Sequence, residues 1–174
     1  MSLQPRQKPA ATGGLPPVTG PEPLILILGS FPSVLSLART EYYGNPRNRF
    51  WVVMEELFGI PAILPYPDRT VLIAEEGIAL WDVVGSCSRA GSADARIRNV
   101  VPNDIAGFLR CHPSVRLIAL NGTTAGRLYQ RYAEVAGVPQ VILPSTSPAN
   151  AAVTFREKVI AWRAVRSALR VKHD

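Results

Sequence analysis

The sequence predicts an α/β fold, a three-layer α/β/α sandwich with a short, mainly parallel central sheet. Three observations lead to this prediction: short apolar runs recur along the chain, each ends in small or polar residues, and amphipathic helical patterns lie between them. Such alternation is typical of a parallel sheet that helices cover on both faces. The chain has 174 residues, 47% of them hydrophobic, which is enough for one sizeable core. We therefore expect a single domain over residues 23–174.

The first third of the chain contains a strand pattern and a helix pattern. Residues 1–22 are rich in proline and glycine, so we expect a mobile segment that is neither a signal peptide nor a membrane span. Residues 24–28 form a continuous apolar run closed by Gly29, as in a strand buried on both faces. Apolar residues at helical spacing then predict a helix over residues 48–58, and Gly59 ends it.

The middle of the chain is less regular. Residues 71–74 are read as a short second strand, and residues 75–84 as a short helix or turn. The polar residues 85–99 are expected to form a surface loop. Asn103 or Asp104 can then cap a helix that runs to residue 111.

The last third repeats the strand and helix pattern twice. Residues 115–122 are apolar until Asn121 and Gly122, and a helix capped by threonine is expected over residues 123–132. Residues 140–150 are read as a third strand with a polar loop, and residues 154–171 as the closing helix. The expected inner face of that helix consists of Phe155, Val159, Trp162, Val165 and Leu169.

Three predicted loops should meet at one edge of the sheet. They cover residues 29–33, 121–124 and 144–150, and each follows a predicted strand. Ligands of parallel sheets bind beyond the carboxyl ends of the strands. We therefore expect the functional site at this edge.

The charge of the chain favours a polyanionic partner. Nineteen Lys and Arg against thirteen Asp and Glu give a formal charge of +6 and a pI near 9.8. Arginine dominates and suits bidentate phosphate contact, although an ordinary basic surface remains an alternative. The two cysteines, Cys87 and Cys111, are too few for a zinc or iron–sulfur site. We expect reduced thiols and a bacterial or archaeal cytosolic location.

Several common chemistries find no support in the motifs. Neither GxxxxGK[ST] nor GxGxxG follows a predicted strand, which argues against nucleotide triphosphate hydrolysis and hydride transfer. No serine lies in a G-x-S-x-G turn, and the only histidines are His112, read as a surface turn residue, and His173 near the end of the chain. We therefore predict no metal and no cofactor.

The polar groups that remain suit a nucleobase. The stretch YYGNPRNRFW, residues 42–51, places aromatic, amide and basic side chains close together. Amides and hydroxyls can hydrogen-bond a flat neutral ring, and an aromatic face contributes about 1–3 kcal/mol of stacking per base. Arg47 and Arg49 can hold the phosphates beside it.

The order of these motifs resembles the uracil-DNA glycosylase superfamily, near its mismatch-specific branch and its hypoxanthine-DNA glycosylase group. The mismatch-specific enzymes open with a strand and GINPG, continue with an aromatic residue and P-x-N-R-F-W, and close with a strand and a PS loop. This chain has GSFPS from Gly29, Tyr43 followed by PRNRFW, and LPSTSPAN from Leu143. The motifs frame residues 24–150, so the resemblance covers almost the whole predicted domain and implies the same fold.

The resemblance implies hydrolysis of the N-glycosidic bond of hypoxanthine or uracil in DNA, after the nucleotide is flipped out. In the mismatch-specific branch the Asn of GINPG positions the attacking water, whereas this chain has Phe31 at that place. The hypoxanthine group implies a later amide, so the predicted catalytic residue is Asn48, with Asn45 as its substitute. A helix cap is the alternative role for Asn48, and one residue can do both.

The remaining roles are also carried over from the resemblance. Tyr43 would stack on the base, with core packing as the alternative, and Asp82 is a weaker candidate for a base or a cap. The predicted base-binding residues are Gly29, Ser30, Phe31, Tyr43 and Asn121. The predicted DNA-binding residues are Arg47, Arg49, Ser145, Thr146, Ser147 and Asn150, with an ordinary turn as the alternative for the serines. Trp51 and Trp162 are expected in the core.

Two other functions stay open on the sequence alone. A module of the same fold that binds damaged DNA or nucleobases without cleaving them would explain Phe31. An unrelated small-molecule enzyme with a flavodoxin-like sheet would bind a free ligand and would lack salt-sensitive DNA binding. Under the main hypothesis the partner is damaged, double-stranded DNA, and the protein is a monomer without a membrane partner.

Overall fold

A four-stranded sheet forms the centre of the computed structural model, which describes residues 10–171. Its strands lie in the order β3-β2-β6-β7, and every neighbouring pair is parallel. Their bounds are Ile25–Gly29 for β2, Ile78–Asp82 for β3, Leu117–Asn121 for β6 and Gln140–Leu143 for β7. Because the strands are parallel, their carboxyl ends and the loops that follow lie at one edge of the sheet.

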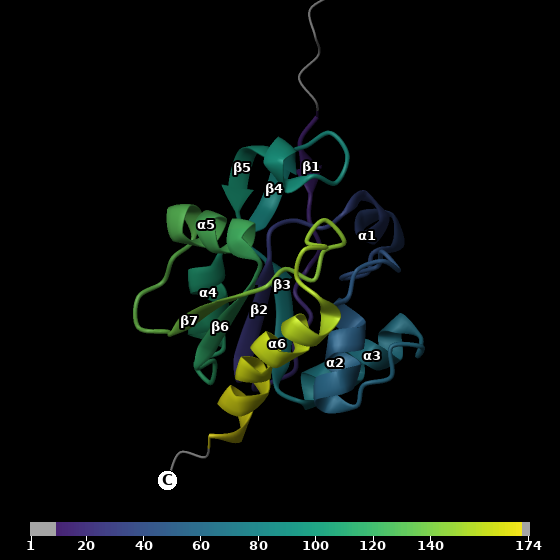
Figure 1. Ribbon diagram of the computed structural model, residues 1–174. Helices are drawn as coiled ribbons and strands as arrows, with labels where there is room; N and C mark the ends of the chain where they lie inside the picture. The colour runs from purple at the N-terminus through teal and green to yellow at the C-terminus, as the bar shows by residue number, and fades with distance from the viewer. Residues whose placement is uncertain (1–9, 172–174) are drawn as a thin grey trace, which may run out of the picture.

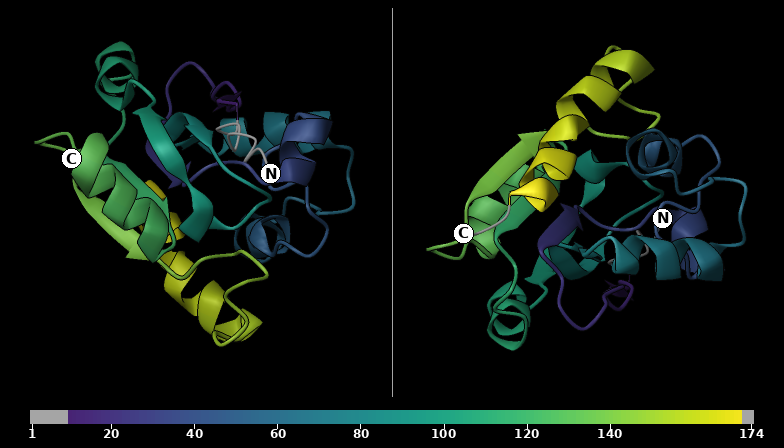
Figure 2. Two further views of the ribbon diagram at one scale, coloured as in Figure 1. Left: turned by 90° about the horizontal axis from the view of Figure 1, so that it is seen from above. Right: turned by 90° about the horizontal axis from the view of Figure 1, so that it is seen from below.

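Helices cover both faces of this sheet (Figure 1, Figure 2). One face is covered by α2 (Phe50–Phe58), α3 (Tyr66–Glu75) and α6 (Phe155–Arg170), and the other by α4 (Ile105–Cys111) and α5 (Thr123–Tyr132). Side chains alternate along a strand, so Ile25 and Ile27 of β2 face the first group while Leu26 and Leu28 face the second. The predicted three-layer fold is therefore confirmed.

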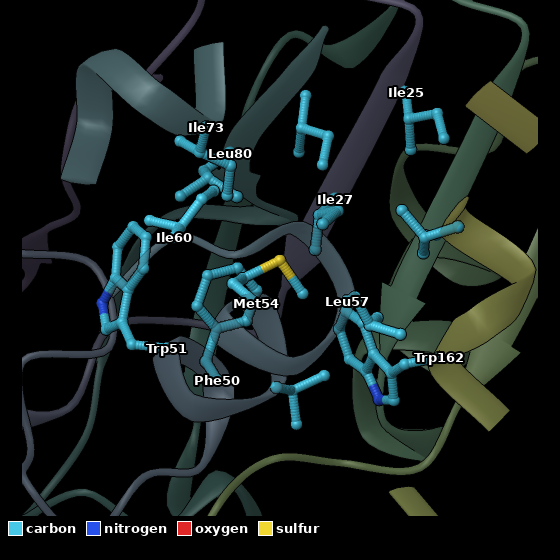
Figure 3. Packing of buried hydrophobic residues seen from close by; sticks show 14 of the residues in the cluster. Ile25, Ile27, Phe50, Trp51, Met54, Leu57, Ile60, Ile73, Leu80 and Trp162 are labelled. Carbon is cyan, nitrogen blue, oxygen red and sulfur yellow. The ribbon is translucent and has the colours of Figure 1, made fainter. Parts of the chain in front are cut away.

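The larger core lies between the sheet and α2. Phe50, Val53, Met54 and Leu57 follow the i, i+3, i+4, i+7 pattern and are all buried. Figure 3 shows Met54 of α2 beside Ile27 of β2, and Leu57 of α2 beside Trp162 of α6, which is fully buried. Gly59, with φ at 68°, ends α2 in the left-handed conformation that glycine adopts easily. Trp51 and Trp162 both lie in this core, as predicted.

A capping box starts α6. Thr154 accepts a hydrogen bond from the Glu157 N–H, and the Glu157 carboxylate accepts one from the Thr154 N–H. Trp162 and Val165 are buried as predicted, whereas Phe155 is 38% exposed. The expectation for Phe155 is wrong: its ring lies outside the core cluster, with the Arg49 guanidinium carbon 6.0 Å from its centre.

Two elements in the middle of the chain differ from the prediction. Residues 71–74 belong to the helix α3, not to a strand, and Val71 is exposed. Pro67 lies in the first turn of α3, where its missing N–H costs nothing, and that helix-start signal outweighs the short apolar run. The second strand of the sheet is instead β3, within residues expected to be a helix or turn.

A second, antiparallel sheet was not predicted. It has the order β1-β4-β5, with β1 at Thr12–Gly13, β4 at Val84–Ser88 and β5 at Arg98–Pro102. Two further elements are the helix α1 (Val34–Arg39) and a 3-10 turn, η1 (Asp94–Arg96). Both ends of the expected surface loop over residues 85–99 are therefore part of a sheet.

The expectation of a mobile segment over residues 1–22 also needs correction in part. Residues 1–9 lie outside the described residues, but Thr12 pairs with Cys87, and Val18 exchanges backbone hydrogen bonds with Leu80. Proline and glycine here interrupt regular strands without preventing these pairings. Within residues 10–171, no helix combines the length and apolar character needed to cross a bilayer.

Candidate active site

A cleft with a volume of about 950 Å³ opens at the carboxyl ends of the parallel strands. The three predicted loops converge there, as the topology requires. All predicted site residues except Arg47 and Arg49 line it: Gly29, Ser30, Phe31, Tyr43, Asn45, Asn48, Asn121, Ser145, Thr146, Ser147 and Asn150. Arg47 and Arg49 are exposed and flank Asn48 in the chain. Their individual roles remain predictions.

Asn121, at the end of β6, is held in one orientation. Its Oδ1 accepts a hydrogen bond from the Thr146 backbone N–H at 3.0 Å, and its Nδ2 donates to Thr146 Oγ1 at 2.9 Å. A backbone N–H is always a donor, so this contact fixes which amide atom is oxygen. Each amide atom has capacity for one more hydrogen bond. Thr146 was predicted to contact DNA. Its side chain is fully buried and holds Asn121 instead.

Two asparagine turns precede α2. Asn45 Oδ1 accepts a hydrogen bond from the Arg47 N–H at 3.0 Å, and Asn48 Oδ1 accepts one from the Phe50 N–H at 2.9 Å. The second bond satisfies the N–H of the first residue of α2. The N-cap of that helix is Arg49, which has no side-chain cap, so the alternative of a helix cap for Asn48 is wrong and its side chain forms a turn just before α2. Asn48 Nδ2 has no hydrogen-bond partner within residues 10–171 and remains available in the cleft.

Tyr43 joins the core to the cleft. Its ring stacks on Phe50 with centroids 4.0 Å apart, and it also lines the cleft, so both considered roles are compatible. Its backbone is left-handed, with φ at 55°, which is rare for a bulky residue. Burial, reinforced by Asp82 and opposed by Asn121, raises the pKa of the Tyr43 hydroxyl well above its usual value. The hydroxyl therefore stays protonated and can donate.

Asp82 lies at the floor of the cleft, at the end of β3. It pairs with Gly29 in the sheet, is 4% exposed, and its Oδ2 has no hydrogen-bond partner in the described chain. A Cβ added to Gly29 would lie only 2.5 Å from Asp82 Oδ1, so the glycine leaves the space that the carboxyl occupies. Burial raises the pKa of Asp82 from 3.8 to about 7; Asp94 adds to this and Arg89 opposes it.

Asp94 and Arg89, in the segment between β4 and β5, lie near the site but were not predicted from the sequence. Asp94 lines the cleft and accepts a hydrogen bond from Ser30 Oγ at 2.8 Å, and burial raises the pKa of its carboxyl. The Arg89 guanidinium lies 4.9 Å from the Phe31 ring centre and donates to the Pro32 carbonyl. No spacing in the sequence relates this segment to Gly29, since only the antiparallel sheet brings the two together.

Helix α6 holds the loop of residues 144–150 in place. Trp162 Nε1 donates to the Pro144 carbonyl at 2.9 Å, and Lys158 Nζ donates to the Asn150 carbonyl at 3.0 Å. Within the loop, Asn150 Nδ2 donates to the Ser145 carbonyl at 3.1 Å. The Arg49 N–H also donates to the Thr146 carbonyl at 2.9 Å, which ties this loop to the start of α2.

The raised pKa of Asp82 predicts a pH-dependent stability. Between pH 3.8 and about 7 the folded protein keeps a proton that the unfolded chain has lost. The contribution of Asp82 to the free energy of unfolding therefore falls as the pH rises through this window. Asp82→Asn is expected to raise the free energy of unfolding by roughly 2–4 kcal/mol at pH 8 and to change it little at pH 4. Urea denaturation measures this; a variant less stable than the wild type at pH 8 would contradict the assignment.

The site offers amides, hydroxyls, an aromatic face and a buried carboxyl around one cavity. In the part of the chain that the structure describes, no three His, Cys, Asp or Glu side chains are grouped to hold a metal ion. This donor set suits a flat hydrogen-bonding ring better than a cation.

Comparison with known proteins places the chain among close relatives. The family model for the uracil DNA glycosylase superfamily matches residues 16–166. A hypoxanthine DNA glycosylase of Methanosarcina acetivorans is 36% identical over 153 residues, which cover 87% of this chain and 96% of that protein. One of Methanosarcina barkeri is 33% identical over 138 residues, covering 79% and 87%. The solution NMR structure of a uracil DNA glycosylase candidate from M. acetivorans has a TM-score of 0.81 and 34% identity, covering 93% of this chain and all of the other.

Proposed function

This chain belongs to the uracil DNA glycosylase superfamily, and from that premise we propose that it hydrolyses the N-glycosidic bond of deaminated bases, hypoxanthine and uracil, in DNA. It is a hydrolase of the DNA glycosylase class, as its named relatives indicate. The alternative of a binding module without catalysis is not favoured by these relatives.

The observation that carries the proposal is the fixed amide of Asn121. Its oxygen can accept one further hydrogen bond and its nitrogen can donate one, side by side at the cleft. Hypoxanthine and uracil both present a ring N–H next to a carbonyl, which matches this pair. Adenine and cytosine present an acceptor next to an amino group, and in the same orientation they would leave both Asn121 atoms unsatisfied.

The depth of the cleft requires the base to leave the DNA stack. Flipping a nucleotide costs a few kcal/mol, and least for weakly paired bases such as deaminated ones. The exposed side of Tyr43, backed by Phe50, can then stack on the base. Ser145, Ser147 and Asn150 lie on the fixed loop at the cleft, where they can contact the flanking phosphates.

Bond cleavage builds positive charge on the sugar and negative charge on the departing base. Asn48, whose Nδ2 is free, orients a water toward the sugar carbon. The Ser30 hydroxyl already donates its one proton to Asp94, so the backbone N–H groups after Gly29 stabilise the base as it leaves. We also propose that the protein acts on double-stranded DNA as a monomer; the cytosolic location stays a prediction.

Arg47 and Arg49 are expected to set the salt dependence of DNA binding. Each phosphate contact contributes about 0.9 to the slope of log K against log salt concentration. The double variant Arg47→Gln, Arg49→Gln should therefore bind a deoxyinosine duplex more weakly and with a shallower slope. Fluorescence anisotropy at several salt concentrations measures both quantities.

Arg131→Gln is the matched control for that experiment. Arg131 is exposed in the last turn of α5, at the end away from the cleft-lining Thr123 and Thr124. Arg131→Gln should leave the slope of log K against log salt concentration unchanged. Equal slopes for the wild type and the double variant would rule out phosphate contacts by Arg47 and Arg49.

Base excision from defined oligonucleotides tests the proposed function. Single- and double-stranded substrates carrying deoxyinosine, deoxyuridine, deoxyxanthosine or a mispaired thymine are incubated with the protein, and abasic sites are revealed by alkaline strand cleavage. Excision of hypoxanthine or uracil is expected. Tight binding to these duplexes without any excision would establish the binding module instead.

A further inference from the structure

Asp82 is a buried acid that lines the cleft, and the proposed hydrolysis does not yet use it. It is 4% exposed, its Oδ2 has no hydrogen-bond partner in the described residues, and it lines the cleft floor beside Gly29. The Tyr43 hydroxyl, also buried without a hydrogen-bond partner there, would lie 3.4 Å from a Cβ on the same glycine. Leaving buried polar groups unpaired is costly, so two such groups at one spot indicate a ligand that pairs with them.

The sheet order places Asp82 opposite Asn121. β2 lies between β3 and β6, so Asp82 and Asn121 flank Gly29 from its two sides. A ring that lies over Gly29 and hydrogen-bonds Asn121 through its N–H and carbonyl edge turns another edge toward Asp82. For hypoxanthine that edge belongs to the imidazole ring and carries N7, a basic nitrogen. Uracil has no basic ring nitrogen to offer.

Resting on the glycosylase function proposed above, we propose that Asp82 is a catalytic acid for purine substrates and donates its carboxyl proton to N7 of the extruded hypoxanthine. As the C1′–N9 bond breaks, its electron pair moves to the base, which departs neutral because N7 has gained the proton. Water adds to C1′ and releases one proton, which restores the Asp82 carboxyl. The sum is one water consumed, one free hypoxanthine and one abasic sugar.

The surroundings of Asp82 support a protonated carboxyl near neutral pH. Burial and Asp94 raise the pKa of Asp82 to about 7, while Arg89 lowers it. The other titratable groups near it are Tyr42 and Tyr43, whose own pKa values are raised far above the neutral range, so both stay uncharged. The acid is therefore present below pH 7 and is lost as the pH rises above it.

Single-turnover excision of hypoxanthine and of uracil from matched duplexes, between pH 5.5 and 9, tests this role. The wild-type rate constant on deoxyinosine should fall about tenfold for each pH unit above the pKa of Asp82, and that on deoxyuridine should not follow it. Asp82→Asn keeps the shape and a donor N–H but cannot transfer a proton. It should slow hypoxanthine excision about 10²- to 10⁴-fold at pH 6.5 and remove the fall with pH.

The outcomes separate this inference from the function on which it rests. Asp68→Asn, an exposed aspartate of α3 outside the cleft, is the matched control and should behave as the wild type. Equal losses on both substrates in Asp82→Asn, or a wild-type deoxyinosine rate that does not fall above pH 7, would overturn the acid role while leaving a glycosylase. A wild type inert on every lesion would overturn both. The wild-type profile alone decides the question if the variant fails to fold.

Discussion

Replacing Asn48 by alanine is expected to slow base excision about 10²- to 10³-fold, the usual effect of removing one positioned donor from a transition state. Affinity for the lesion duplex should change little, because Asn48 acts on the water and not on the phosphates. Its Nδ2 is free at the cleft while its Oδ1 accepts a hydrogen bond from the Phe50 N–H at the start of α2. Loss of that hydrogen bond should also lower the free energy of unfolding by about 1 kcal/mol.

Asn48→Asp separates the two roles of this side chain. An aspartate keeps the oxygen that accepts from the Phe50 N–H, so stability should stay near that of the wild type. It removes the amide N–H groups, so excision should still fall. Single-turnover rates and urea denaturation of both variants measure the two effects. Wild-type turnover in Asn48→Ala would refute the catalytic assignment and direct attention to Asn45, which lines the same cleft.

Gly29→Ala is expected to have the second largest effect. The added Cβ would lie 2.5 Å from Asp82 Oδ1, so the carboxyl must move, whereas the Tyr43 hydroxyl at 3.4 Å would be in ordinary van der Waals contact with it. A displacement of about 1 Å in a catalytic site can cost 10²-fold in rate, and a loss of that order is expected on both deoxyinosine and deoxyuridine.

Gly13→Ala provides the matched control. Gly13 lies in β1, and a Cβ there meets no atom within 4 Å. Its excision rate should equal that of the wild type. If Gly29→Ala also retains the wild-type rate, the base does not lie over Gly29. That result would contradict the proposal that Asn121 and Asp82 contact the base from the two sides of Gly29.

The sequence predicts the place of the site correctly where polar or small residues mark the end of a strand. Apolar runs that stop at Gly29, Asn121 and Leu143 identified three strands, and the loops after them do meet at one cleft. Asp82 was only a weak candidate because residues 71–74 were read as the second strand. They belong to α3, and the second strand is β3, which ends at Asp82. An apolar run of four residues cannot by itself distinguish a buried strand from one side of a helix.

The rest of the site depends on contacts between segments far apart in the sequence. Asp94 reaches Ser30 only because β4 and β5 form a sheet beside the cleft, and polar residues gave no sign of that pairing. Thr146 reads as an exposed loop threonine, yet it is fully buried against Asn121. Pairings of this kind follow from tertiary packing, which overrides local composition.

The central claim is that the cleft catalyses hydrolysis at the sugar carbon of a deaminated nucleotide. The most direct measurement is a reaction on a deoxyinosine duplex in water enriched in ¹⁸O, followed by mass spectrometry of both products. Our account predicts free hypoxanthine without the label and an abasic sugar that carries one ¹⁸O at C1′. An intact deoxyinosine strand that remains bound to the protein, with neither product formed, would contradict it.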